Sequence, residues 1–167
     1  MPFTICTIGC GGMATAAHGY AYAKYVAEHP NTLLAACCDI DTERAESFRA
    51  RFGFARFYTD LLTMLERERP DAVCLVAPVE LTCELSCRVL EQGFPLLLEK
   101  PPGQTVDELD RILAVAQAKG VAAQVAFNRR YAPLLLRLHS LLEEQVEAGS
   151  LQHLQVEFTR TGRTDPD

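Results

Sequence analysis

The feature that most constrains the fold is a glycine-rich turn between a short apolar strand and a helical pattern near the N-terminus. Residues 4–8 read as the strand, and Gly9-x-Gly11-x-x-Ala14 follows directly. Gly9 permits a tight turn, Gly11 permits close approach of a diphosphate to the backbone, and the small Ala14 lets helix and strand pack closely. The motif indicates a dinucleotide site, although a strand-to-helix connection without a ligand has the same spacing.

An acidic residue follows the next predicted strand. Residues 33–38 read as a buried strand, and Asp39 stands where a carboxylate accepts hydrogen bonds from an adenosine ribose. The interval from Gly11 is somewhat longer than the roughly 20 residues usual for this motif, which a long first helix would absorb. Ile40 follows, and no arginine stands beside Asp39, so we expect NAD rather than NADP. The alternative is a strand-end turn before a helix that Asp41 caps.

Composition limits the class of protein. The 167 residues suit one domain of ordinary size, and 49% hydrophobic with 23% charged residues is typical of a globular protein with a full core. A net charge of −6 argues against nucleic acid or an anionic membrane as partner. The sequence contains neither a leader pattern nor an apolar run approaching the roughly 18 residues of a membrane span. We therefore expect a cytoplasmic protein.

The seven cysteines form an odd number and lie mostly within apolar strand or helix patterns. Buried, reduced thiols explain this distribution best. Cys83 and Cys87 are one helical turn apart, but no His or Cys pair stands nearby to complete a tetrahedral site, so we expect no metal.

Strands and helices alternate along the chain, which predicts a doubly wound parallel sheet of the Rossmann type. The helical segments show apolar stripes or end at glycine, as at Gly53, Gly93 and Gly120. The predicted strands cover residues 4–8, 33–38, 55–58, 72–77, 94–98 and 121–127. The predicted helices cover residues 13–28, 42–51, 60–67, 80–92, 106–119 and 132–148.

Ligands of such sheets bind at the carboxyl ends of the strands, where the unusual residues of this chain gather. The residues just past those ends are Gly9, Asp39, Pro78, Glu99 and Asn128. The fifth predicted strand ends in Glu99-Lys100-Pro101, and the sixth in Asn128-Arg129-Arg130-Tyr131.

These motifs, together with Gly-Cys-Gly-Gly-Met in the first turn, resemble the glucose-fructose oxidoreductase, inositol dehydrogenase and rhizopine-catabolism (Gfo/Idh/MocA) family over essentially the whole chain. The resemblance implies an NAD(P)-dependent oxidoreductase that acts on a CH–OH group. Such an enzyme transfers hydride between a nicotinamide cofactor and a sugar, polyol or related small molecule. It also implies a homo-oligomeric full-length protein, with a small-molecule substrate as its partner.

The resemblance assigns Lys100 to the active site, where its amino group is suited to transferring the proton of the substrate hydroxyl. Glu99 is expected to orient Lys100 or the nicotinamide ribose, the alternative being a surface ion pair. Arg130, with Lys100, is a candidate for substrate binding, the alternative being a solvated charge. The cofactor-binding candidates are Gly9, Gly11, Gly12, Met13, Ala14, Asp39, Pro78, Thr82, Glu99 and Asn128.

Two features depart from the family. Thr82 occupies a position where the family often has histidine, and a hydroxyl cannot titrate near neutrality, so any contact made by that histidine is in doubt. The four histidines of the chain, His18 among them, are expected to be packing or surface residues.

The C-terminal segment is the second departure. Residues 151–161 alternate as a strand with one buried face, and such a strand needs partners. We expect a cofactor domain over residues 1–128, then a connecting helix and the first strand of a missing C-terminal α/β domain over residues 129–167. That domain would choose the substrate, whose identity this sequence does not give.

Two function classes remain open, and a third agrees less well with the motifs. The chain is either part of an enzyme or a non-catalytic NAD-binding regulatory module, a role that the absence of histidine at Thr82 would permit. An S-adenosylmethionine methyltransferase also uses a glycine-rich turn and a ribose-binding acid. That assignment does not account for Glu99-Lys100-Pro101.

Overall fold

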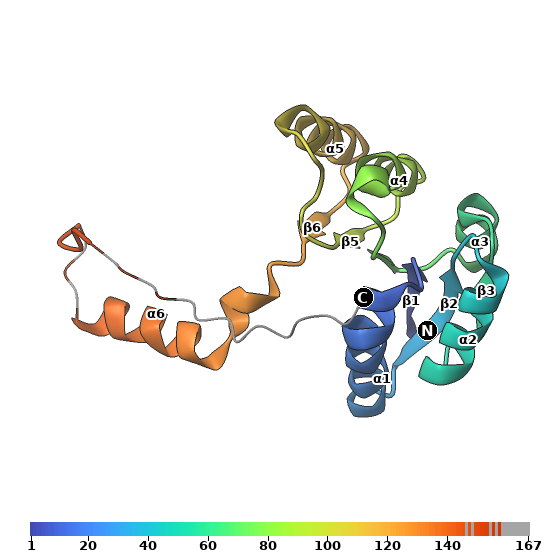
Figure 1. The fold of residues 1–167 in the computed structure, drawn as a ribbon, viewed down its shortest axis with the longest axis horizontal. Helices are drawn as coiled ribbons and strands as arrows, with labels where there is room; N and C mark the ends of the chain where they lie inside the picture. The colour runs from blue at the N-terminus through green and yellow to red at the C-terminus, as the bar shows by residue number, and fades with distance from the viewer. Residues whose placement is uncertain (146, 148, 154, 156, 158–167) are drawn as a thin grey trace, which may run out of the picture. The chain divides into compact units, whose positions relative to one another are not determined.

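A parallel sheet organises the first part of the chain in a computed structural model that describes residues 1–145, 147, 149–153, 155 and 157. The chain divides into two compact units, residues 1–127 and residues 128–167. In the first unit, six strands pair in the order β3-β2-β1-β4-β5-β6 (Figure 1). These strands are β1 (Phe3–Ile8), β2 (Thr32–Cys38), β3 (Arg56–Tyr58), β4 (Ala72–Leu75), β5 (Leu96–Leu98) and β6 (Ala123–Val125). All neighbouring strands run parallel, which confirms the predicted doubly wound Rossmann fold.

The helices of this unit follow the predicted order. They are α1 (Gly19–Glu28), α2 (Thr42–Phe52), α3 (Leu61–Glu68), α4 (Val79–Glu91) and α5 (Val106–Lys119). A π-helical turn, η1 (Ala14–His18), precedes α1 without a break. Asp41 caps α2 as predicted, because its side chain accepts a hydrogen bond from the Arg44 N–H. The predicted ends at Gly53 and Gly120 are also observed, and both glycines adopt the left-handed conformation that favours this residue.

Several strands are shorter than the apolar runs predict. The run at residues 94–98 contributes only Leu96–Leu98 to the sheet, and that at residues 121–127 only Ala123–Val125. Pro95 lacks an N–H group for the ladder, and β6 lies at the edge of the sheet, where it pairs with β5 alone. The apolar runs are therefore longer than the segments that pair in the sheet.

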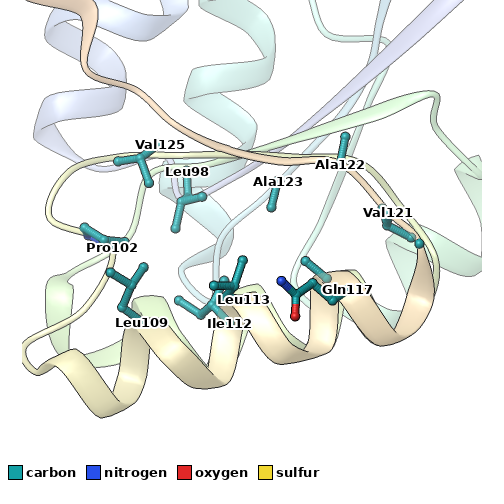
Figure 2. Close-up of a pocket in the computed structure, with 12 residues that line it drawn as sticks. Leu98, Pro102, Leu109, Ile112, Leu113, Gln117, Val121, Ala122, Ala123 and Val125 are labelled. Carbon is teal, nitrogen blue, oxygen red and sulfur yellow. The ribbon is translucent and has the colours of Figure 1, made fainter.

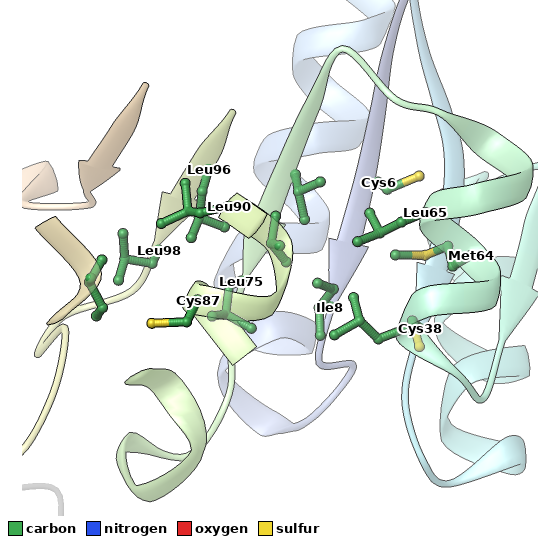
Figure 3. Packing of buried hydrophobic residues seen from close by; sticks show 14 of the residues in the cluster. Cys6, Ile8, Cys38, Met64, Leu65, Leu75, Cys87, Leu90, Leu96 and Leu98 are labelled. Carbon is green, nitrogen blue, oxygen red and sulfur yellow. The ribbon is translucent and has the colours of Figure 1, made fainter. Parts of the chain in front are cut away.

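The central strands β2 and β4 are buried on both faces over most of their length, since successive side chains of a strand point to opposite sides. One apolar cluster joins Cys6 and Ile8 of β1 to residues of α3, α4 and α5 (Figure 3). The other joins Leu34 and Cys37 of β2 to Ala14 and to aromatic side chains from α2 and the turn that follows it. This packing on both faces holds the carboxyl ends of the central strands in fixed positions relative to one another.

The second unit contains a 3₁₀ turn, η2 (Asn128–Tyr131), and the helix α6 (Pro133–Gln145). The helix was predicted over residues 132–148, of which 146 and 148 lie outside the described residues. The strand predicted at residues 151–161 likewise lies largely outside them. None of the helices in the described part of the chain has the length and hydropathy needed to cross a membrane.

Candidate functional site

A cleft of about 330 Å³ opens at the carboxyl ends of β1, β4 and β5. Its lining comes from three segments far apart in sequence, which the strand order of the sheet brings together. The lining residues are Gly11, Gly12, Met13, Ala14, Val76, Ala77, Pro78, Glu99 and Lys100. The structure thus brings together most of the predicted site residues, and Gly11 and Lys100 share one cleft.

The glycines of the turn have two different roles. Gly9 has a φ of +89°, and a Cβ atom there would lie 1.9 Å from the carbonyl oxygen of Val76. Its N–H donates a 2.8 Å hydrogen bond to the Cys38 oxygen. A Cβ atom on Gly11 or Gly12 would meet nothing within 4 Å. Gly9 is therefore required by the fold, whereas Gly11 and Gly12 leave open space beside the start of a helix.

This open space has the chemistry of an anion site. The helix begins at Gly12, and the first N–H groups of a helix lack intrahelical acceptors. These groups and the helix dipole together favour negative charge at that end. The cradle fits a diphosphate group because no side chain of Gly11 or Gly12 fills it.

Asp39 supports the glycine turn. Asp39 is 9% exposed. Its carboxylate accepts a 2.9 Å hydrogen bond from the Cys10 N–H and a 3.0 Å hydrogen bond from the Asp41 N–H. The guanidinium of Arg44 also pairs with it, with 3.4 Å between Nη1 and Oδ1. The expectation that no arginine stands beside Asp39 is therefore wrong in three dimensions, because the first turn of α2 brings Arg44 back toward the strand end.

Glu99 and Lys100 follow β5 directly. The Glu99 N–H donates to the Leu75 oxygen at 3.0 Å, which continues the ladder with β4 by one bond. One carboxylate oxygen of Glu99 accepts the Lys100 N–H at 2.9 Å. The Lys100–Pro101 peptide bond is cis, and the Lys100 side chain is exposed within the lining of the cleft.

His18 is the site residue that sequence reasoning missed. Its Nε2 lies 2.9 Å from the second carboxylate oxygen of Glu99, and its Nδ1 lies 3.2 Å from the hydroxyl of Tyr22. The only sequence signal was its position behind the glycine turn. Its partner lies 81 residues away, so no local pattern identifies the contact.

Three further candidates are not among the lining residues of the cleft. Thr82 is buried in α4, where its hydroxyl donates to the Pro78 oxygen at 3.2 Å, and it does not line the cleft. Asn128 and Arg130 are exposed residues of η2 in the second unit, where the Arg130 guanidinium lies 5.8 Å from the ring centre of Tyr131. Their assignment to cofactor and substrate stays a prediction.

A second cavity of about 480 Å³ lies between α5 and the strands β5 and β6 (Figure 2). Its walls are apolar apart from Gln117 and carry no titratable side chain. This composition offers no group for acid–base chemistry. The cleft with Glu99 and Lys100 is therefore the better candidate site.

The cysteines belong to the packing of the fold. All seven are free and buried, and burial raises the pKa of the Cys6 and Cys38 thiols to about 12. Within the described residues, no group of three or more His, Cys, Asp or Glu side chains is arranged to hold a metal ion.

Comparison with known proteins identifies a family model, an oxidoreductase family with an NAD-binding Rossmann fold (GFO_IDH_MocA), that matches residues 3–127. The chain is 28% identical to a D-glucoside 3-dehydrogenase from Escherichia coli over 97% of its own length and 44% of that protein.

Two solved structures are similar in fold. One is a WlbA dehydrogenase from Chromobacterium violaceum in complex with NADH and UDP-GlcNAcA, with a TM-score of 0.77 and 25% identity over 86% of this chain and 40% of that one. The other is a 3-ketoreductase from Actinomadura kijaniata in complex with NADP and TDP-benzene, with a TM-score of 0.75 and 28% identity over 86% and 43%. The chain thus spans less than half the length of these relatives.

Proposed function

The chain belongs to the Gfo/Idh/MocA oxidoreductase family, and from that premise we propose that it is the cofactor-binding part of an enzyme transferring hydride between a nicotinamide dinucleotide and a sugar, polyol or related small molecule. One observation carries the proposal. The open cradle at Gly11 and Gly12 and the side chain of Lys100 line the same cleft.

The cradle would hold the diphosphate of the cofactor. Backbone N–H groups from Gly12 onward would donate to the phosphate oxygens, and the absence of a side chain at Gly11 would allow close approach. Met13, Ala14 and Pro78 complete the walls on this side of the cleft. When bound, the nicotinamide supplies or accepts the hydride.

Asp39 would recognise the adenosine ribose, and we propose NAD as the preferred cofactor. A carboxylate repels a 2′-phosphate, which favours NAD. Arg44 lies against the same carboxylate and offsets part of that repulsion. The preference for NAD over NADP is therefore smaller than a lone carboxylate would produce.

Lys100 would serve the substrate, both by binding it and by handling its proton. Its ammonium group donates a proton to the substrate oxygen during reduction, and the neutral amine accepts one during oxidation. Glu99 fixes the Lys100 backbone through the 2.9 Å hydrogen bond from the Lys100 N–H. Asn128 and Arg130 of the second unit would contribute further polar contacts to the cofactor and substrate.

Thermal unfolding of the chain with NAD, NADP and S-adenosylmethionine tests the proposal. A ligand at 100 times its dissociation constant that binds only the folded state adds about 2.7 kcal/mol to the free energy of unfolding. At about 2–4 °C per kcal/mol, the dinucleotides raise the melting temperature by roughly 5–10 °C. Unchanged melting temperatures with both dinucleotides would contradict cofactor binding, and stabilisation by S-adenosylmethionine alone would support a methyltransferase.

A Lys100→Ala variant of the full-length protein tests the proposed catalytic role of Lys100. Lys100→Ala removes the group that handles the proton but leaves the glycine cradle intact, so NAD affinity should stay within about threefold. Oxidation of the substrate should fall by about 10²–10⁴-fold, the usual contribution of a general acid or base. Undiminished turnover would exclude Lys100 as the proton-handling group.

A further inference from the structure

We propose that His18 is a positioning residue of the site, which holds the Glu99 carboxylate in the orientation that fixes the backbone of Lys100. The inference rests on the proposed function, because Lys100 is the group that acts on the substrate there. It extends the site from the rim of the cleft to the helix behind the glycine turn.

The contacts form a continuous chain. The Tyr22 hydroxyl lies 3.2 Å from His18 Nδ1, and His18 Nε2 lies 2.9 Å from one Glu99 oxygen. The other Glu99 oxygen accepts the Lys100 N–H at 2.9 Å. Both oxygens of the Glu99 carboxylate are thus engaged, and the plane of the carboxylate is determined by His18 on one side and Lys100 on the other.

The Glu99 carboxylate sets the direction of its own contact, because its oxygens accept and His18 Nε2 must therefore carry the hydrogen. Burial raises the pKa of the Tyr22 phenol, so the hydroxyl keeps its proton and is available as a donor to His18 Nδ1. In the proposed arrangement Nε2 donates to Glu99, and Nδ1 is the nitrogen that faces the Tyr22 hydroxyl. The series of contacts ends at the partly buried phenol of Tyr22, an arrangement that suits orientation of a carboxylate.

The contact is protected from water, unlike an ordinary surface pair. The side chains of His18 and Glu99 are 16% and 14% exposed. The pair of His139 and Glu143 on α6 has a similar separation of 3.3 Å but is 72% and 68% exposed. Exposed ion pairs contribute little to the stability of a fixed geometry, because water and salt screen the charges. The His18–Glu99 contact is therefore the one able to hold a fixed geometry, and His139 offers a matched control.

The π turn gives His18 its position. The Gly19 N–H donates to the Ala14 oxygen, five residues back, so η1 holds one more residue per hydrogen-bonded turn than an α-helix. Gly19 lies against Phe52, since a Cβ atom at Gly19 would come within 2.5 Å of that ring. The wider turn lets Gly19 meet α2 while the residue before it reaches Glu99. π turns occur frequently at functional sites, which agrees with this role.

Nuclear magnetic resonance of the ¹⁵N-labelled chain without cofactor tests the inference. The expected ring spectrum shows His18 as the Nε2–H tautomer, and Tyr22→Phe reduces that preference. His18→Leu should speed solvent exchange of the Lys100 amide at least tenfold, because Glu99 loses its second partner. His18→Gln should keep the exchange within about threefold of the native rate, because its amide N–H donates to Glu99. His139→Gln should change nothing.

Two results would overturn the inference. One is a native His18 ring protonated on Nδ1 alone, and the other is a Lys100 amide that exchanges at the native rate in folded His18→Leu. If His18→Leu does not fold, the tautomer and the comparison of Tyr22→Phe with the native chain decide the question.

The same spectra separate this inference from the proposed function. Addition of NAD should shift the Gly11 and Gly12 amide signals in the native chain and in His18→Gln. If these signals stay unmoved, cofactor binding fails, while the exchange of the Lys100 amide still reports on His18. If these signals shift and the Lys100 amide of His18→Leu exchanges at the native rate, the positioning role alone is wrong.

Discussion

Alanine substitutions at Gly9 and at Gly11, two glycines of the same turn, should differ in their effects on the melting temperature. At Gly9 the backbone has a φ of +89°, which costs a residue with a Cβ roughly 1–2 kcal/mol. The added atom would also lie 1.9 Å from the Val76 oxygen, and such overpacking costs about 1–3 kcal/mol. Gly9→Ala should therefore lower the free energy of unfolding by about 3 kcal/mol. For a chain of this size the melting temperature falls by roughly 6–12 °C.

Gly11→Ala is the matched control for the fold and the test for the ligand. Its Cβ meets nothing within 4 Å, and Gly11 does not have a positive φ. Loss of glycine flexibility in the unfolded chain then stabilises by about 0.4–1 kcal/mol, so the melting temperature stays level or rises slightly. The new methyl group occupies the space of the diphosphate. NAD affinity should fall at least tenfold.

Thermal unfolding followed by circular dichroism measures the first effect, and quenching or enhancement of NADH fluorescence in a titration measures the second. The reasoning fails if Gly9→Ala melts within 2 °C of the native chain. It also fails if Gly11→Ala binds NADH with native affinity, because the cradle would then not be the diphosphate site.

Three further predictions concern charge and thiols. Hydrogen bonds from Arg56 hold the pKa of the Glu68 carboxyl below its usual 4.5, so this contribution to stability is present above that pH and is lost as the pH falls through the folded-state value. Glu68→Gln should lower the melting temperature at pH 7, and the difference from the native chain should shrink as the pH falls through the folded-state pKa of Glu68. Melting temperatures that differ equally at all pH values would exclude the effect. Asp39→Ser should narrow the ratio of NAD to NADP affinity and Arg44→Leu should widen it, as measured by titration; unchanged ratios would refute ribose recognition by this carboxylate. All seven buried thiols should resist Ellman's reagent in the folded chain and react only in denaturant, and rapid labelling without denaturant would contradict their burial.

Much of the architecture could be predicted from local pattern. Apolar runs, helix caps such as Asp41 and stop signals such as Gly53 act within a few residues, so the sequence alone indicates where each element lies. The order of strands and helices then indicates a parallel sheet, and the sheet implies that residues following its strands share one edge. Gly11 and Lys100, which follow the first and fifth strands, line one cleft at that edge, whereas Asp39 is not part of its lining.

Individual side chains at that edge could not be predicted in the same way. The hydrogen bond from the Thr82 hydroxyl to the Pro78 oxygen was not expected, and the assignment of Thr82 to the cofactor stays a prediction. Arg44 is five residues from Asp39 in sequence, and only the turn between strand and helix makes them partners.

What the sequence by itself determined is the succession of elements and the edge of the sheet where chemistry belongs, because periodicity and capping depend on neighbours along the chain. What only the tertiary structure decided is which side chains meet there. The contact of His18 with Glu99 depends on an extra residue in one helical turn and on the packing of α1 against α2. Such contacts depend on packing between distant segments, and no short stretch of sequence contains that information.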